Sequence, residues 1–368
     1  MRRLIRPVVC LFSLLWLCIF SPLLFASTET EFELEKVTDG LGIPWGLAFL
    51  SEERLLITER KGGVKLLDLT TNKITSLKNA PRVIANGQGG MLDVAVSPQA
   101  PAWIYFTYVG GSSDKHSTIL ARAQLEGDGL TRWHDLLITT GSDTGQHFGS
   151  RIAFDAKGYV YFGVGDRGER DSAQDLSLHQ GSVMRLHLDG SIPKDNPFVT
   201  TEDAQLAIWT YGHRNPQGMA YDADNKRLWL IEHGPRGGDE INLLAKGKNY
   251  GWPVISHGRE YISGLPVGES KQKEGMEQPV KVYIPSIAPG SLLYYTGEAF
   301  PQWRGNLFAG ALKLRHLNRV QLNDRAEAVD EQRLLQDLDQ RIRALAQSPR
   351  GWIYFSTDSG NIYRLKPR

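Results

Sequence analysis

Short apolar runs recur along the chain and predict β-strands rather than helices. The runs are rich in Val, Ile, Tyr and Phe, and Gly, Asp and Asn separate them, as is typical of strands joined by tight turns. One unit recurs: a run with a Gly-x-apolar-Ala-like pattern, a turn, a second run such as Tyr-Val-Tyr-Phe, and a last run that ends in Arg-Leu or Leu-Asp. The first and second runs of its copies lie at 45–49 and 55–58, 91–95 and 104–106, 151–154 and 159–162, 218–221 and 228–230, 291–294 and 306–308, and 342–346 and 352–355.

The spacing of these copies predicts the fold class. Successive units begin roughly 45 to 75 residues apart, which is typical of the blades of a β-propeller. Six copies predict an all-β, six-bladed β-propeller whose first strands line a common axis. No linker composition interrupts the repeats, so we expect residues 27–368 to form a single catalytic domain. Uneven spacing predicts long loops around 165–205 and 250–285, which we expect to build up one face.

The N-terminal segment differs from the rest of the chain. Three arginines within the first six residues precede an apolar run at 8–20, and a possible cleavage point after Ala26 follows. This layout predicts a secretory signal peptide, residues 1–26, and therefore a periplasmic mature protein without a membrane span. A retained membrane anchor is the alternative, since the apolar run approaches spanning length if it continues past its proline.

Cysteine content and charge exclude several classes of function. Both cysteines, Cys10 and Cys18, lie in the signal peptide, so the mature chain has no disulfide, thiol chemistry or cysteine metal ligand. The full chain has 42 Lys and Arg residues against 41 Asp and Glu residues. Removal of the three leader arginines gives a net charge of about −2, which does not favour nucleic acid as a partner.

A glycine-rich loop suggests a metal site. Gly234 and Pro235 begin a stretch that continues through two further glycines to Asp239 and Glu240. Glycine allows backbone angles that turn carbonyl groups outward, and carbonyls beside carboxylates are the hard oxygen ligands that Ca²⁺ prefers. An ordinary surface turn is the alternative interpretation of this loop taken alone.

A histidine and an aspartate are expected to meet in the third blade. His147 lies just before the first strand of that blade, and Asp166 follows its second strand. A carboxylate that holds one imidazole nitrogen fixes the tautomer and raises the basicity of the other, which makes a general base.

Cationic side chains are expected around the same mouth. Arg214 and Asn215 precede the fourth inner strand and form a donor pair for an oxygen-rich ligand. Arg341 and Arg343 share one side of the sixth inner strand by alternation, and Lys313 adds a third cation. Because neighbouring guanidiniums are costly to bury without anions, a ligand with several carboxylates is the expected partner.

Together these segments resemble the soluble quinoprotein sugar dehydrogenases, and most closely the bacterial periplasmic aldose sugar dehydrogenases. The resemblance covers essentially the whole mature chain, and its motifs lie at 87–90, 146–151, 213–218, 233–240, 249–253 and 340–343. It implies a six-bladed propeller that uses pyrroloquinoline quinone (PQQ) and Ca²⁺. It also implies an aldose sugar as substrate, oxidised at the anomeric carbon to a lactone, and an external electron acceptor.

The resemblance assigns the catalytic roles. His147 would take the proton from the anomeric hydroxyl while a hydride passes to the quinone, and Asp166 would orient it. Arg214 and Asn215 would bind the quinone oxygens, and Arg214 would stabilise the negative charge that develops there. Gln88 would form hydrogen bonds at the edge of the substrate or cofactor.

The resemblance also assigns the remaining ligands. Lys313, Arg341 and Arg343 would hold the cofactor carboxylates, and Tyr261 would be a further cofactor contact. The carbonyls of Gly234 and Pro235 would bind the Ca²⁺ that polarises the quinone. Glu240 and, through its carbonyl, Tyr250 would bind a second, structural Ca²⁺.

The sugar side departs from the best-known glucose-oxidising members. Ile284 stands where those proteins have an aromatic residue over the quinone, and Asp171 stands where a glutamine would help to hold the sugar. With Gln88 and Asp171 on the substrate side, we expect a broad range of aldoses rather than a preference for glucose.

Two other classes of function share parts of this pattern. A calcium-dependent propeller lactonase also uses an axial Ca²⁺ and a histidine, and a non-catalytic binding propeller could retain the fold with a structural ion. The three cations Lys313, Arg341 and Arg343 favour the dehydrogenase, because a lactonase metal centre needs carboxylates and amides and a binding module needs neither.

Overall fold

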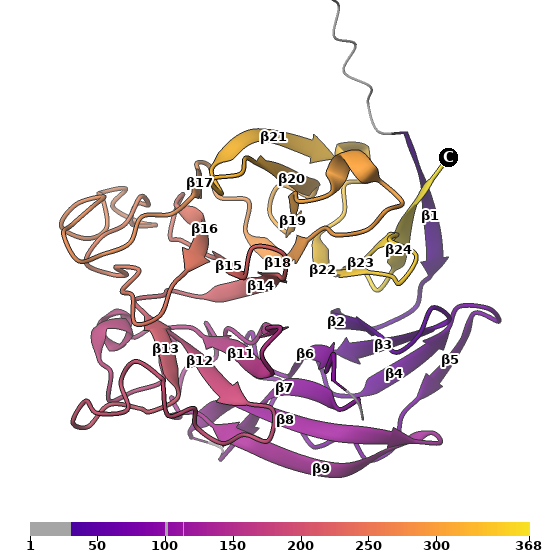
Figure 1. Ribbon diagram of the computed structural model, residues 1–368, viewed down its shortest axis with the longest axis horizontal. Helices are drawn as coiled ribbons and strands as arrows, with labels where there is room; N and C mark the ends of the chain where they lie inside the picture. The colour runs from indigo at the N-terminus through magenta and orange to yellow at the C-terminus, as the bar shows by residue number, and fades with distance from the viewer. Residues whose placement is uncertain (1–30, 100–101, 113) are drawn as a thin grey trace, which may run out of the picture. The chain divides into compact units, whose positions relative to one another are not determined.

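The computed structural model describes residues 31–99, 102–112 and 114–368, and the regular secondary structure of these residues is almost entirely β-strand (Figure 1). Residues Phe32–Arg368 form one compact unit. Their strands make six four-stranded antiparallel sheets arranged as the blades of a β-propeller, which confirms the predicted fold class. The signal peptide that we predict at 1–26 lies outside the described residues.

Blades 1 to 3 follow one another in chain order, each with its first strand at the axis. Their strands are β2 (Pro44–Phe49), β3 (Arg54–Glu59), β4 (Val64–Asp68) and β5 (Lys73–Ser76); β6 (Met91–Val96), β7 (Ile104–Gly111), β8 (His116–Glu126) and β9 (Gly129–Ile138); and β10 (Ile152–Phe154), β11 (Tyr159–Val164), β12 (Ser182–His187) and β13 (Ile208–Tyr211). The short helix η1 (Arg170–Gln174) lies between β11 and β12.

Blades 4 and 5 repeat this order, whereas blade 6 takes its outer strand from the start of the chain. The strands are β14 (Pro216–Asp222), β15 (Arg227–Glu232), β16 (Asp239–Leu244) and β17 (Lys281–Tyr283); β18 (Pro289–Tyr294), β19 (Leu307–Ala311), β20 (Leu317–Leu322) and β21 (Ala328–Leu334); and β22 (Ile342–Gln347), β23 (Ile353–Thr357), β24 (Ile362–Pro367) and β1 (Phe32–Thr38). Two further short helices are η2 (Pro301–Trp303) and η3 (Gln336–Leu338). Because β1 pairs antiparallel with β24, the two ends of the propeller chain close the ring (Figure 1).

Apolar layers between neighbouring blades form the core. Between blades 1 and 2, for example, Leu56, Met91 and Phe106 pack together. Similar layers separate the other neighbouring blades. Since layers cover both faces of each sheet, the second strands read as continuous apolar runs rather than as alternating patterns.

One arginine joins all six blades at the axis. Arg151, at the start of blade 3, is 6% exposed and forms an ion pair with Asp93 of blade 2. Its guanidinium also donates to the carbonyls of Trp45, Gln217, Gly290 and Arg343, which belong to blades 1, 4, 5 and 6. A single planar cation with several donors therefore satisfies backbone groups that converge on the axis.

Two long loops meet at one end of the propeller. Gln174, in the connection between β11 and β12, donates to the Asn249 side chain and to the carbonyl of Trp252, in the connection between β16 and β17. The segment 188–207 starts at the other end of β12, where His187 pairs with Tyr159, and returns so that Gln205 donates to the carbonyls of Leu176 and Ser177. In the described part of the chain, no helix is long and apolar enough to cross a membrane.

Candidate active site at the propeller mouth

A polar cavity of about 290 Å³ lies where the inner strands begin. This volume is close to the lower end of the range for small-molecule sites, ~300 Å³. Its lining combines arginines with aromatic and amide groups, and consists of Ile43, Trp45, Arg60, Gly87, Gln88, Phe148, Gly149, Gln217, His233, Leu312, Arg341, Arg343 and Asp358.

A larger cavity of about 460 Å³ lies on the axis among the later residues of the inner strands. Its lining is mainly apolar, and its charged residues Asp93 and Arg151 are already paired with each other. The smaller cavity has the charged groups that chemistry requires, so it is the candidate active site despite its size.

His147 lies beside this cavity in a conformation that few residues adopt. Its φ angle is +53°, in the left-handed region, and its backbone N–H donates to the side-chain oxygen of Gln88 over 2.8 Å. The ring is mostly buried, and its Nδ1 lies 2.6 Å from a carboxylate oxygen of Asp166. The turn that carries His147 is thus held by blade 2 on one side and by Asp166 on the other.

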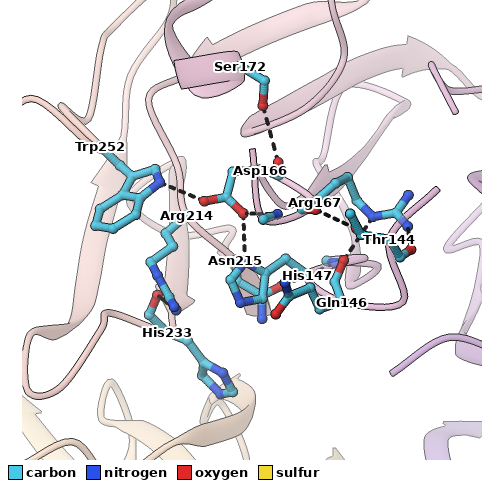
Figure 2. A network of polar contacts seen from close by, with 12 residues as sticks. Thr144, Gln146, His147, Asp166, Arg167, Ser172, Arg214, Asn215, His233 and Trp252 are labelled. Atoms are coloured by element: carbon cyan, nitrogen blue, oxygen red, sulfur yellow. Dashed lines mark hydrogen bonds and ion pairs between the residues drawn. The ribbon is translucent and has the colours of Figure 1, made fainter. Parts of the chain in front are cut away.

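Asp166 is buried, and both of its carboxylate oxygens take part in hydrogen bonds (Figure 2). One carboxylate oxygen contacts His147 and accepts the N–H of Gly168, and the other accepts the indole N–H of Trp252 over 2.7 Å. Burial alone would raise the pKa of Asp166, but hydrogen bonding and charge from His147, together with the Gly168 N–H, lower it below its usual value. An ionised carboxylate only accepts, so Nδ1 of His147 carries a proton, and in the neutral ring Nε2 then presents a lone pair.

Arg214 lies next to this network and faces the glycine-rich loop (Figure 2). Its guanidinium is 5.3 Å from the centre of the Trp252 ring and donates to the carbonyls of Gly234 and His233 over 2.8 and 3.2 Å. The backbone N–H of Arg214 donates to Glu232 over 2.7 Å. The positive charge of Arg214 is therefore held between the His147–Asp166 pair and the predicted metal loop.

Hydrogen bonds shape the glycine-rich loop. The N–H of Gly234 donates to Asp239, whose carboxylate also accepts from Ser286 and from the backbone of Ala288. Burial raises the pKa of Asp239 to about 6. The carbonyl of Gly234 accepts from Arg214, and that of Pro235 lies 3.2 Å from the Ser286 hydroxyl, which has one proton and is closer to Asp239, at 2.9 Å. Both carbonyls that we expected to bind metal thus keep at least one lone pair.

A third, very small cavity is lined by residues of this loop. Its volume of about 20 Å³ suits one water-sized occupant, and both Glu232 and Glu240 line it together with Tyr250. Glu232 accepts hydrogen bonds from His213, Asn242 and the backbone of Arg214. Burial and the nearby charge of Glu232 raise the pKa of Glu240 well above its usual value. Within residues 31–99, 102–112 and 114–368, no group of three His, Cys, Asp or Glu side chains could hold a metal ion.

At the opposite side of the main cavity, two arginines share one carboxylate. Arg341 and Arg343 both contact Asp358, through Nε atoms at 2.7 and 2.8 Å. The guanidinium of Arg343 also stacks 4.1 Å from the centre of the Trp45 ring. The two arginines lie on the same side of β22, as alternation predicts, but the chain itself supplies an anion that our sequence analysis missed.

The structure brings some predicted residues to the cavity and leaves others outside its lining. Gln88, Arg341 and Arg343 line the cavity. Lys313 is exposed and is not part of the lining, although the preceding residue, Leu312, is. Asn215 is buried and its side-chain oxygen accepts from Gly149 and Gln217.

Two further predicted residues are exposed to solvent. Tyr261 is 61% exposed on the loop between β16 and β17. Asp171 is exposed on η1. Neither residue lines the cavity.

Sequence reasoning missed four residues of this site. Asp358 follows β23 in a Thr-Asp-Ser-Gly turn, and the sequence of such a turn does not indicate which arginines it contacts. Trp252 belongs to a motif that we had noted without assigning it a role. Two other residues could have been noticed from their position next to the second strand of a blade. Arg60 directly follows β3 and donates to the carbonyls of Gly87 and Gly89, and Glu232 is the last residue of β15.

Comparison with known proteins gives a consistent result. The chain matches the glucose/sorbosone dehydrogenase family over residues 41–364. It is 38% identical to the aldose sugar dehydrogenase YliI of Escherichia coli K12, in an alignment that covers 98% of this chain and 97% of the relative.

Solved structures extend the comparison. The soluble aldose sugar dehydrogenase from Escherichia coli in its apo form has a TM-score of 0.88 and 38% identity, covering 92% of this chain and 100% of that one. The PQQ-bound form of aldose sugar dehydrogenase from Streptomyces coelicolor has a TM-score of 0.75 and 26% identity, covering 92% and 99% of the two chains.

Proposed function

Since the chain belongs to the glucose/sorbosone dehydrogenase family, whose members are oxidoreductases, we propose that it is a PQQ-dependent aldose sugar dehydrogenase of the periplasm. The reaction removes a hydride from the anomeric carbon of the sugar and a proton from its hydroxyl group, and leaves a lactone. One observation carries the proposal: the His147–Asp166 pair lies beside a cavity lined by arginines.

The cavity fits a cofactor with several carboxylates. Arg60, Arg341 and Arg343 line it against the single carboxylate of Asp358, and exposed Lys313 lies next to its lining. Guanidiniums recognise carboxylates through paired hydrogen bonds, and the excess of positive charge favours a polyanion. When bound, PQQ would supply the quinone that accepts the hydride.

His147 is the proton acceptor in this proposal. Its Nδ1 donates to Asp166, so Nε2 is the atom available to the anomeric hydroxyl. Transfer of that proton creates an imidazolium, which the ionised Asp166 stabilises at 2.6 Å. Arg214 supplies a fixed positive charge nearby for the negative charge that develops on the acceptor side.

The loop from Gly234 to Glu240 fits a hard divalent cation. The carbonyls of Gly234 and Pro235 would bind the Ca²⁺ next to the cofactor, each through its free lone pair. Glu240 and the carbonyl of Tyr250 would bind a second ion, since Glu232 and Glu240 line one small cavity and a divalent cation would neutralise their repulsion. Both assignments rest on oxygen donors, which Ca²⁺ prefers.

The sugar side supports a broad aldose substrate. Ile284 is 67% exposed and Asp171 is exposed, so neither residue encloses the sugar tightly. We propose that electrons then pass to an external acceptor at the same open mouth. Export through the signal peptide 1–26 is part of the proposal, and N-terminal sequencing of protein from the periplasmic fraction tests it.

The central experiment titrates the purified apoprotein with PQQ, with and without Ca²⁺, and assays a panel of aldoses with a dye acceptor. We expect sugar-dependent dye reduction that requires both PQQ and Ca²⁺, with lactone as the product. Lactone hydrolysis without PQQ would instead identify a lactonase. Tight PQQ binding without oxidation of any aldose would contradict the proposed substrate class.

A further inference from the structure

The carboxylate of Asp358 joins the two arginines that line one side of the cavity. Arg341 Nε donates to one of its oxygens over 2.7 Å. Arg343 donates through Nε over 2.8 Å and through Nη2 over 2.9 Å, so both oxygens of Asp358 are used. Arg343 and Asp358 are mostly buried, whereas Arg341 is about half exposed.

Further contacts fix the positions of the two arginine side chains and of Asp358. Arg341 Nη1 donates to the carbonyl of Leu312 in blade 5, and Arg343 stacks on Trp45 in blade 1. The backbone N–H of Asp358 donates to the carbonyl of Arg341 over 3.0 Å. The two guanidiniums, which come from long side chains with many rotamers, are therefore fixed across blades 5, 6 and 1 by contacts within the protein.

Asp358 accepts hydrogen bonds from only some of the N–H groups of each arginine. A guanidinium has five N–H groups, and the contacts above occupy Nε and one terminal nitrogen of each residue. Each arginine therefore keeps the second terminal nitrogen for another acceptor. Burial by itself would raise the pKa of Asp358, but both arginines lower it, so the carboxylate is ionised at neutral pH.

We propose that Asp358 is a positioning residue that holds Arg341 and Arg343 as a preformed receptor for carboxylates of the quinone cofactor. This inference rests on the proposed function, because it takes PQQ as the ligand. Without Asp358 the two cations repel each other and must be ordered when the ligand binds, which costs conformational entropy. Removal of the Asp358 charge also removes its repulsion of an anionic ligand, which acts in the opposite direction, so the sign of the measured change in affinity decides between the two effects.

The test measures PQQ binding by calorimetry on the apoprotein with Ca²⁺, at 0.15 M salt. Asp358→Asn keeps the shape but supplies only one accepting oxygen, and we expect its affinity for PQQ to fall by about tenfold. Asp339→Asn is the matched control, because Asp339 pairs with exposed Arg315 and does not line the cavity. The control is expected to bind PQQ as the wild type does.

A variant cycle separates positioning from general damage to the fold. In an Arg341→Ala/Arg343→Ala background, Asp358→Asn should cause no further loss of affinity, because its targets are gone. Asp358→Glu keeps the negative charge between the two arginines, so we expect it to fold and to lose less affinity for PQQ than Asp358→Asn. Wild-type or tighter binding by Asp358→Asn, or an equal loss in the double-alanine background, would overturn the inference. If the wild type itself bound no PQQ, the proposed function would fail as well.

Discussion

His147 and Asp166 lie 2.6 Å apart at the mouth of the propeller, one on the turn before an inner strand and the other after the next strand of the same blade. This relationship fixes which nitrogen of the imidazole is free. It also places the proton acceptor on a rigid part of the fold, because blade 3 supplies both partners.

The first prediction concerns His147. His147→Gln should reduce turnover by roughly a hundredfold or more, the usual contribution of a positioned base, while PQQ affinity and melting temperature change little. Asp166→Ala should give a smaller defect, because the base remains but is less well oriented. Turnover and PQQ binding should be measured on the same preparations. Near-normal turnover in His147→Gln would exclude this residue as the base.

The second prediction concerns the indole N–H of Trp252, which donates to the second oxygen of Asp166. Trp252→Phe keeps most of the ring but removes the donor, so we expect turnover to fall by about three- to tenfold, less than the full worth of a hydrogen bond to a charged group, because Gly168 and His147 still hold Asp166. Trp229→Phe is the control, because the buried Trp229 N–H has no hydrogen-bond partner within the described residues. Equal turnover in the two variants would show that the Trp252 N–H does not support Asp166.

The third prediction concerns calcium. Saturating Ca²⁺ should raise the melting temperature of the wild type, because a ligand that binds only the folded state stabilises it. Glu240→Gln should lose most of that shift, since it removes a carboxylate from the small cavity. Strong chelation should abolish dye reduction. Full activity after chelation would contradict the proposed metal requirement.

The fourth prediction is a pH dependence of stability that originates from His179. Burial lowers the pKa of His179 to about 4, and its Nδ1 accepts the N–H of Thr140. The folded state therefore keeps the ring neutral between pH 6.5 and 4, whereas the unfolded chain takes up a proton. Stability should be full above pH 6.5 and fall by up to about 3 kcal/mol as the pH drops to 4.

Urea denaturation at several pH values measures this effect. His179→Asn retains an acceptor for the Thr140 N–H and should flatten the dependence between pH 4 and 6.5. His134→Asn on β9 serves as the control because His134 is exposed. An unchanged profile in His179→Asn would assign the pH dependence to other groups.

The fifth prediction concerns the ion pair at the axis. Arg151→Met leaves Asp93 buried without its cation and should lower the free energy of unfolding by about 3–5 kcal/mol. Arg151→Met/Asp93→Asn should lose less, because no charge is then left unpaired. If the single variant were as stable as the wild type in urea denaturation, the axial contacts would not contribute to stability.

Most of the fold could be predicted from the sequence because the second strands of the blades are buried on both faces. Runs such as 55–57 and 159–162 are apolar without interruption, and each lies in the second strand of its blade. The outer strands gave weaker signals, since β9, for example, is largely exposed on one face. The pairing of β1 with β24 was not predicted, because local patterns do not show which distant strand completes a sheet.

The site could be predicted only where local chain geometry brings residues together. His147 and Asp166 belong to one blade, so their contact followed from the order of its strands. Asp358 meets Arg341 through a turn, and Trp252 meets Asp166 across two long loops. These contacts depend on three-dimensional placement, which residue type and spacing do not encode.

The guanidinium of Arg151 also links the walls of the two cavities at the axis. It lines the larger axial cavity, while the residues whose carbonyls it holds, such as Trp45 and Gln217, line the smaller one. On its axial side, the candidate active-site cavity is therefore bordered by backbone groups whose positions depend on this one guanidinium.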